Sequence, residues 1–186
     1  MNEVIEGKNV RIRTYKESDT GYLYEAVTES IPELSQWMPW CNENYKINES
    51  LAWVVSREKA WNEKEEYSFV IEHKESKKFL GAVGLNHIDQ FYRIANLGYW
   101  MRTSETRKGY TSEAALLTAQ FGFQKLNLNR IEIIMSVENI KSQKVAEKVN
   151  ALKECVARNR IILNNKPIDA FVYSLIRDDL KYGDKN

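Results

Sequence analysis

The sequence predicts a mixed α/β fold in which helices pack on a central sheet. Short runs rich in β-branched and aromatic residues, at Tyr67–Glu72, Phe79–Asn86 and Ala95–Met101, are typical of strands. Apolar residues then recur at i, i+4, i+7 and i+11 from Tyr110 to Phe121, which indicates an amphipathic helix. Because a meander of strands comes before helical crossovers, the sheet should contain both antiparallel and parallel pairs.

The chain before this meander is expected to form one strand and two helices. Val10–Arg13 alternates apolar and basic residues, as a half-buried strand does. Asp19 is a candidate cap for a helix that ends near Thr28, and Asn48 for a helix over about Glu49–Lys64. Short polar side chains suit both places because they accept hydrogen bonds from the unpaired N–H groups of a first helical turn.

The chain after the amphipathic helix is expected to form three strands and one short helix. Arg130–Val137 is a strand candidate, and Ser142–Val149 places apolar residues on one side of a helix. Asn150 stands where that helix needs a left-handed residue, a conformation that Asn tolerates. Leu152–Val156 and Ala170–Ile176 are the last two strands, joined by a polar hairpin. The expected order is therefore β, α, α, β, β, β, α, β, α, β, β.

Composition and charge restrict the class of protein. The 186 residues fit one domain, expected over residues 1–186, and their net charge is +1. That balance does not suit a protein that binds nucleic acid directly, which needs a basic excess for the phosphates. No apolar run is long enough for a membrane span or a secretory signal. The two cysteines, Cys41 and Cys155, form no disulfide framework, so a reducing cytoplasm is the expected location.

The segment Gly98–Ala114, which is written GYWMRTSETRKGYTSEA, carries the most informative local pattern. A strand is followed by a basic loop with Arg107, Lys108 and Gly109, and a helix begins at once at Tyr110. The first turn of a helix presents unpaired N–H groups and a positive dipole end, and a glycine lets an anion approach the backbone. This predicts a pyrophosphate cradle, although the glycine spacing fits neither a Walker loop nor a dinucleotide fingerprint. The alternative is an ordinary connection with a solvated basic loop.

Charge is distributed unevenly along the chain. Residues 101–160 hold eleven Lys and Arg against six Glu, whereas residues 29–66 hold eight Glu against four Lys and Arg. The first segment suits a polyanionic cofactor and the second a cationic partner. The alternative is that both are ordinary solvated faces.

The ordered motifs of the chain resemble the GNAT (Gcn5-related) N-acetyltransferases, and in particular the RimJ/RimL-like branch, whose members acetylate the α-amino groups of ribosomal proteins. The resemblance covers about Lys8 to Asp178 and implies the GNAT fold, an α/β (α+β) arrangement with a mixed, mostly antiparallel central sheet flanked by helices. The matching pieces are Trp37-Met38-Pro39-Trp40, Phe79–Leu85, Gly98-Tyr99-Trp100, Lys108–Ala114, and Asn139 with Ser142 ahead of Val145–Lys148.

By this resemblance the cofactor is acetyl-CoA. Its pantetheine arm would lie along the strand that ends at Met101–Thr103, and its pyrophosphate would sit on the loop before the following helix. Asn139 and Ser142 would contact the pantetheine or lie near the thioester. The implied cofactor-binding residues are Met101, Arg102, Thr103, Arg107, Lys108, Gly109, Tyr110, Thr111, Ser112, Asn139 and Ser142.

The resemblance also implies two catalytic positions. In the wider family a tyrosine often serves as the general acid where this chain has Ala146, so Ser142 is the better candidate proton donor. A backbone N–H near Trp100 is suited to stabilise the oxyanion. Relatives often carry a glutamate two residues before the Gly-Tyr-Trp motif, but here Asn96 stands there, and an amide cannot act as the general base.

Other candidates for the base are few, and the site asks for no metal. The remaining candidates are His87, Asp89 and Glu113. Glu113 fits better as a carboxylate that stabilises the first turn of its helix. No His/Cys cluster has the spacing of metal ligands. Acetyl transfer from a thioester to an amine needs neither a metal nor a protein nucleophile, because a thiolate leaves readily.

The expected acceptor is a primary amine, best matched by the N-terminal α-amino group of a protein, ribosomal or otherwise. Trp37, Trp40 and His87 are the expected substrate-binding residues, the tryptophans on an irregular aromatic stretch over residues 31–45 that covers the acceptor mouth or a subunit contact. A homodimer is a further expectation. Alternatives are a small amine such as a polyamine or aminoglycoside, a non-catalytic acyl-CoA sensor, which Asn96 and Thr106 would suit, and an interaction module without a CoA site.

Overall fold

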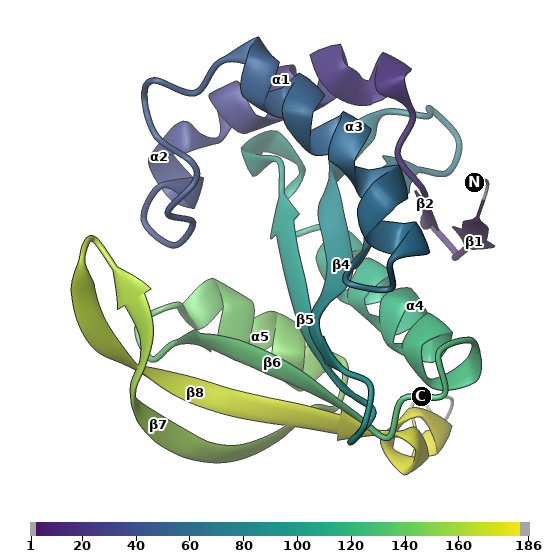
Figure 1. Ribbon diagram of the computed structural model, residues 1–186, viewed down its shortest axis with the longest axis vertical. Coiled ribbons are helices and arrows are strands. Elements are labelled where there is room, and N and C mark those ends of the chain that lie inside the picture. Colours follow the sequence, from purple (N-terminus) through teal and green to yellow (C-terminus); the bar gives the residue numbers. More distant parts are fainter. Residues whose placement is uncertain (1–2, 183–186) are drawn as a thin grey trace.

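The computed structural model describes residues 3–182 and contains one eight-stranded sheet with the order β1-β2-β3-β4-β5-β6-β8-β7 (Figure 1). The strands are β1 (Val4–Glu6), β2 (Val10–Arg13), β3 (Tyr67–His73), β4 (Phe79–Asp89), β5 (Ile94–Met101), β6 (Arg130–Ser136), β7 (Leu152–Leu163) and β8 (Lys166–Ile176). The helices are α1 (Thr20–Glu29), α2 (Ile31–Leu34), α3 (Ile47–Asn62), α4 (Tyr110–Gln124) and α5 (Ile140–Lys148), with 3-10 turns at Glu17–Asp19, Thr103–Glu105 and Arg177–Tyr182. This confirms the predicted mixed, mostly antiparallel sheet flanked by helices.

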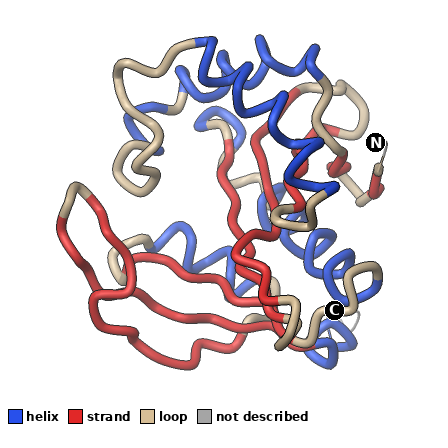
Figure 2. Tube along the Cα trace, viewed as in Figure 1, coloured by secondary structure: helices blue, strands red, loops and turns tan. Residues whose placement is uncertain are grey.

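Helices cover both faces of the sheet (Figure 2). Helices α4 and α5 pack on one face, where Leu97, Phe121 and Ile133 belong to the larger buried cluster. Helices α1 and α3 pack on the other face over a smaller cluster that includes Val54 and Val70. Because side chains alternate along a strand, each residue of β4 and β5 belongs either to the α4–α5 face or to the α1–α3 face.

Several elements differ from the sequence expectation. The stretch over residues 31–45 contains the short helix α2, in which Pro32 occupies the first turn, where no N–H is needed. The three-residue strand β1 was not expected, because its pairing with β2 is set by register and not by a local pattern. Strands β7 and β8 are longer than predicted and meet at Asn164 and Asn165, whose φ angles of 49° and 59° form the polar hairpin that the sequence predicts.

The predicted helix ends are confirmed in one case and wrong in two. Asn150 is left-handed, with a φ of 62°. Asp19 does not cap α1 through its side chain, because its buried carboxylate accepts two hydrogen bonds from the Arg13 guanidinium, each 2.8 Å long. Helix α3 begins one residue before Asn48, at Ile47. The Glu49 carboxylate accepts from the backbone N–H of Lys46, the residue that precedes the helix.

Candidate functional site

Strands β5 and β6 form a wedge, because they are paired over only a short stretch. The two are parallel neighbours at Ile94–Asn96 and Arg130–Glu132. Beyond those residues β5 continues along β4, β6 continues along β8, and the two strands diverge (Figure 1). In the described part of the chain, Leu97–Met101 therefore has no paired strand on its β6 side, and its backbone groups border the wedge.

The direction of the backbone groups in β5 follows from one hydrogen bond. The N–H of Arg102 donates to the carbonyl of Leu80 on the β4 side, at 2.7 Å. Because successive N–H groups of an antiparallel strand alternate between its two edges, the N–H of Trp100 also faces β4, while those of Tyr99 and Met101 face the wedge. The backbone N–H donor that the sequence analysis expects near Trp100 is therefore best supplied by Tyr99 or Met101.

The loop after β5 leads into a cradle of free backbone donors at the start of α4. Gly109 caps the helix with a φ of 83°, and Arg107 is also left-handed, with a φ of 64°. The first backbone hydrogen bond of the helix joins the Glu113 N–H to the Gly109 carbonyl, at 3.1 Å. Among residues 3–182, the structure records no acceptor for any of the six N–H groups of residues 107–112. Such a run of donors at the positive end of a helix dipole is suited to a diphosphate.

Three lysines surround this cradle; two are paired with Glu105, and the third, Lys148, has no recorded carboxylate partner among the described residues. Glu105 accepts from Lys108 Nζ at 2.8 Å and from Lys78 Nζ at 2.6 Å, and these two hydrogen bonds hold the pKa of its carboxyl below the usual value. Lys148 Nζ, from the end of α5, lies 3.2 Å from the place that a Cβ on Gly109 would occupy. The sequence reasoning missed Lys148, because no local pattern links it to the loop.

Helix α5 faces the wedge through a small polar cluster. The Asn139 side chain caps the helix by accepting from the Ser142 N–H at 3.1 Å. The Tyr99 hydroxyl donates to the Ser142 carbonyl at 3.0 Å and lies 3.1 Å from the Ser142 Oγ. Burial raises the pKa of Tyr99 well above its ordinary value, so this phenol stays neutral. Sequence reasoning singled out Asn139 and Ser142 but not Tyr99, although Tyr99 belongs to the Gly-Tyr-Trp motif.

On the α1–α3 side, a cleft of about 320 Å³ opens against the same strand. Aromatic rings form much of its wall, and its lining includes two carboxylates, Glu49 and Glu66, the second of which is paired with Arg57. Of the expected substrate residues, Trp40 lines the cleft; Trp37 and the exposed His87 are not part of its lining. The lining residues are Leu23, Met38, Trp40, Tyr45, Glu49, Trp53, Glu66, Ser68, Ala82, Val83, Gly84, Asn86, Gly98, Tyr99 and Trp100.

The floor of the cleft is nearly free of side chains where it meets β5. Ser68, Gly84 and Gly98 are register partners across β3, β4 and β5. A Cβ built on Gly98 would have one neighbour within 4 Å, the Asn86 Nδ2 at 3.7 Å. The strand segment that borders the wedge is therefore accessible from the cleft as well, and the two hollows share β5.

Near this floor the polar side chains are an amide pair and the carboxylate of Glu66, the residue just before β3. Asn96 Nδ2 donates to Asn86 Oδ1 at 2.9 Å, so an amide pair occupies the position where relatives often carry a glutamate. Glu66 Oε1 accepts from the Ser68 hydroxyl at 2.5 Å, and its other oxygen lies 2.7 Å from Arg57 Nη1. Glu66 was not a sequence candidate, because only the pairing of β3 with β4 brings it to the site.

Two of the other candidate bases have structural contacts. The Glu113 carboxylate accepts from the Asn9 side chain at 2.9 Å and from its backbone at 2.8 Å. Burial alone would raise the pKa of Glu113, but these donors outweigh it and lower the pKa. Asp89 accepts from the N–H groups of Phe91 and Tyr92 in the turn before β5. Glu113 therefore joins α4 to the segment before β2, and Asp89 stabilises its own turn.

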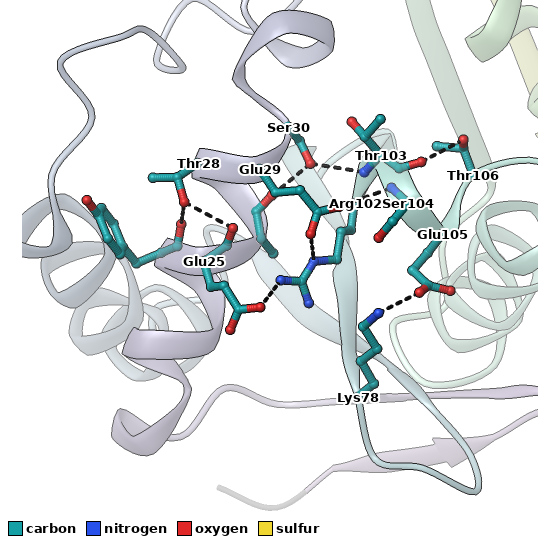
Figure 3. Close-up of polar contacts among 12 residues, drawn as sticks. Glu25, Thr28, Glu29, Ser30, Lys78, Arg102, Thr103, Ser104, Glu105 and Thr106 are labelled. Atoms are coloured by element: carbon teal, nitrogen blue, oxygen red, sulfur yellow. Dashed lines mark hydrogen bonds and ion pairs between the residues drawn. The ribbon is translucent and has the colours of Figure 1, made fainter.

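The side chain of Arg102, an expected cofactor ligand, points away from the wedge. It is 5% exposed and forms ion pairs with Glu25 and Glu29 of α1 (Figure 3).

Among the described residues, no group of three or more His, Cys, Asp or Glu could hold a metal ion. In the same part of the chain, no helix has the length and apolar character needed to cross a membrane.

Comparison with known protein families gives one clear match. A model of the acetyltransferase (GNAT) domain matches residues 9–151. N-acetyltransferase YoaA of Bacillus subtilis (strain 168), described as uncharacterized, is 28% identical over 131 residues, which are 70% of this chain and 74% of that protein. The ribosomal-protein-serine acetyltransferase of Escherichia coli (strain K12) is 27% identical over 101 residues, covering 54% of this chain and 56% of that protein.

Solved structures share the fold over nearly the whole chain. The ribosomal L7/L12 α-N-protein acetyltransferase RimL in complex with coenzyme A superposes with a TM-score of 0.87, at 21% identity, covering 95% of this chain and 99% of that one. The microcin C7 self-immunity acetyltransferase MccE in complex with acetyl-CoA and AMP gives a TM-score of 0.84 at 21% identity, covering 91% and 93%. At this identity the likeness establishes the fold.

Proposed function

The chain belongs to the GNAT acetyltransferase family, and we propose that it transfers the acetyl group of acetyl-CoA to a primary amine, the N-terminal α-amino group of a protein. The observation that carries the proposal is the run of six N–H groups at residues 107–112, free among the described residues, beside the diverging strands β5 and β6. Acetyl-CoA, when bound, supplies an acetyl group activated as a thioester. This chain supplies the groups that hold it, the acceptor cleft and the proton donor.

The wedge and the cradle fit the cofactor in shape and charge. The six N–H groups and the start of α4 would bind the diphosphate, and Gly109 would let it approach, because a side chain there would fill the cradle. Lys148 would add a positive charge on the α5 side. The backbone groups of Tyr99 and Met101 would pair with the amides of the pantetheine arm, as a partly added strand does.

The cleft suits an acceptor that carries a positive charge until it reacts. Glu49 and Glu66 favour an ammonium group, and the rings of Trp40, Trp53 and Trp100 favour a cation or an apolar side chain beside it. The amine must lose a proton before attack, and the Glu66 carboxylate with the Ser68 hydroxyl is the candidate acceptor for that proton. The E. coli relative named for ribosomal-protein serine supports a protein N-terminus as the acceptor.

The transfer also needs an oxyanion donor and a proton for the departing sulfur. The N–H of Met101 borders the wedge and is the candidate oxyanion donor. The Ser142 hydroxyl, fixed by the Asn139 cap and the Tyr99 phenol, is the candidate proton donor. Because a thiol has a pKa near 8.5, roughly neutral conditions make this protonation undemanding.

An acetyl-CoA consumption assay with a panel of amines tests the proposal. The panel should hold peptides that begin with serine or alanine, the same peptides with a blocked N-terminus, a polyamine and an aminoglycoside. We expect turnover with the free peptides and none with the blocked ones. Turnover of the small amines alone would replace the protein acceptor with a small-molecule one.

A second candidate function is a non-catalytic sensor of acyl-CoA. The amide pair of Asn86 and Asn96, at the position where relatives often carry a glutamate, is the observation in its favour. Calorimetric binding of acetyl-CoA without turnover of any amine would support it. Absence of binding would reject both the transferase and the sensor.

A further inference from the structure

A clamp of side chains joins the end of β5 to helix α1 (Figure 3). The Arg102 guanidinium donates through Nε to Glu29 Oε2 at 2.6 Å and through Nη2 to Glu25 Oε1. Glu29 is the more buried partner, with a side chain 35% exposed against 67% for Glu25. A buried guanidinium needs such partners, because an unpaired buried charge is strongly destabilising. The Arg102 side chain is therefore held against α1.

The two residues after Arg102 extend the clamp through their backbone. The Thr103 N–H donates to the Ser30 hydroxyl at 3.0 Å, and the Ser104 N–H donates to the second oxygen of Glu29 at 3.1 Å. The Thr103 hydroxyl donates to Glu33 at 3.0 Å. Residues 102–104 thus form five hydrogen bonds with α1, α2 and Ser30 between them, and Figure 3 shows most of these converging on Glu29 and Ser30.

On its other side the same segment runs directly into the cradle. Glu105 is held by Lys78 and Lys108, and Thr106 donates through its hydroxyl to the Thr103 carbonyl at 2.9 Å. The free N–H groups begin at the next residue, Arg107. No flexible spacer separates the clamp from the proposed diphosphate site.

Helix α1 and the segment after α2 in turn form part of the acceptor wall. Leu23 of α1 lines the cleft, and the Tyr24 ring stacks on Tyr45 with a centroid distance of 6.3 Å. After α2 the chain reaches Trp40, whose ring meets Trp100 edge-on at 6.2 Å. The contacts therefore run without interruption from the cradle, through Arg102, to the acceptor cleft.

We propose that Arg102 is a positioning residue that couples the cofactor cradle to the acceptor wall, so that binding of coenzyme A orders α1 and α2. This inference rests on the proposed function, because it assumes that residues 107–112 bind the cofactor. A ligand that orders one end of a continuous network also lowers the cost of ordering the other end, and the effect is reciprocal. Arg102 acts through Glu25 and Glu29 and touches neither substrate.

Hydrogen exchange with coenzyme A as the probe tests the coupling without knowledge of the acceptor. In the unmodified protein, coenzyme A should slow exchange at residues 107–112 and, by about threefold or more, at residues 20–34, which lie outside the cradle. In Arg102→Gln, protection at 107–112 should remain while protection at 20–34 is lost. Arg102→Lys keeps the charge and should retain part of the effect.

Arg130→Gln is the matched control. Arg130 also binds two carboxylates, Glu132 and Glu154, but it lies on β6 away from α1. Its side chain is 22% exposed against 6% for Arg102, so this variant should lose no more stability than Arg102→Gln and should keep the transmitted protection. A merely structural role for Arg102 would make the two variants behave alike.

The outcomes separate the inference from the proposed function. Coenzyme A that protects neither segment in the unmodified protein would contradict the proposed function itself. Protection at 107–112 without protection at 20–34 would leave the transferase standing and overturn the coupling. Retained protection at 20–34 in both Arg102 variants would overturn the role of Arg102. If Arg102→Gln fails to fold, the comparison of Arg102→Lys with Arg130→Gln decides.

Discussion

The cradle at the start of α4 and the cleft on the α1–α3 side border the same strand but are built from different parts of the chain. The cradle consists of backbone N–H groups from six consecutive residues, 107–112. The cleft consists of side chains from α1, the segment before α3, α3 itself and three strands. Strand β5, from Gly98 to Trp100, is common to both.

The difference shows how such a molecule can keep one ligand and change the other. A backbone site depends on conformation, so few substitutions outside Gly109 should remove it. A side-chain site can be altered at residues outside β5, such as Trp40, Glu49 and Trp53, without disturbing the cradle. We therefore expect cofactor binding to be sensitive to loop geometry and acceptor choice to be sensitive to individual side chains.

The largest effect is expected from a substitution in the cradle, which should weaken acetyl-CoA binding. Gly109→Val places a β-branched residue at a φ of 83° and sets a side chain against Lys148, so acetyl-CoA affinity should fall about a hundredfold. Asn127→Val is the control, because Asn127 is also left-handed, with a φ of 52°, and lies outside the cradle. Calorimetry should show a loss of affinity only for Gly109→Val. Equal losses in both variants would mean that the backbone at Gly109 has no special role.

The next largest effect is expected from a substitution in the cleft that should impair amine turnover and spare cofactor binding. Gly98→Val adds a side chain where the nearest atom is Asn86 Nδ2 at 3.7 Å, so the fold should tolerate it while the cleft floor is blocked. We expect amine turnover to fall by roughly thirtyfold, since small misplacements of a reactant are costly, and acetyl-CoA affinity to stay within about twofold. Steady-state kinetics and calorimetry on the same preparation measure both. A normal acceptor KM and kcat would remove this cleft as the acceptor route.

A smaller effect is expected at the point where the two sites meet. Ser142→Ala removes the hydroxyl beside Tyr99 and should lower kcat about tenfold, less than the roughly hundredfold or more typical of general acid catalysis, because a thiolate is a good leaving group. Cofactor affinity should be nearly unchanged, because the Asn139 cap uses the backbone of Ser142. Tyr99→Phe keeps the ring and tests the phenol separately. An unchanged kcat in Ser142→Ala would exclude its hydroxyl as the proton donor.

The smallest effect concerns stability outside both sites. Hydrogen bonds from Arg130 and Ser174 lower the pKa of Glu154 from 4.5 to about 2. A carboxylate with a lowered folded pKa stabilises the protein above pH 4.5 and loses that contribution as the pH falls toward 2. In Glu154→Gln the free energy of unfolding should therefore depend less on pH in that window, by less than about 1 kcal/mol because the pair is solvent-accessible. Turnover should be unchanged. Altered turnover would show that the β7–β8 hairpin communicates with the site.

The strands and helices predicted from the sequence are largely those observed. Strands β2 to β6 and helix α4 lie within a few residues of their predicted positions, because enrichment in β-branched and aromatic residues and the helical period are local properties of the sequence. The caps at Asp19 and Asn48 were wrong because a helix start offers several polar partners: the Asp19 carboxylate binds the Arg13 guanidinium, and at α3 the Glu49 carboxylate accepts from the Lys46 N–H. Asn150 was right because its left-handed conformation is a local property.

The sequence alone determined the cradle, since Gly109 and the start of α4 lie within one short segment and need only local backbone geometry. It also determined the order of elements, and through that order the mixed sheet. The tertiary structure decided the rest: that Arg102 turns toward α1, that Lys148 reaches Gly109, and that Glu66 faces the cleft. The first two contacts join residues far apart in the chain, and the place of Glu66 depends on how β3 and α3 pack around the cleft. Strand register and helix packing decide all three, and no local pattern encodes them.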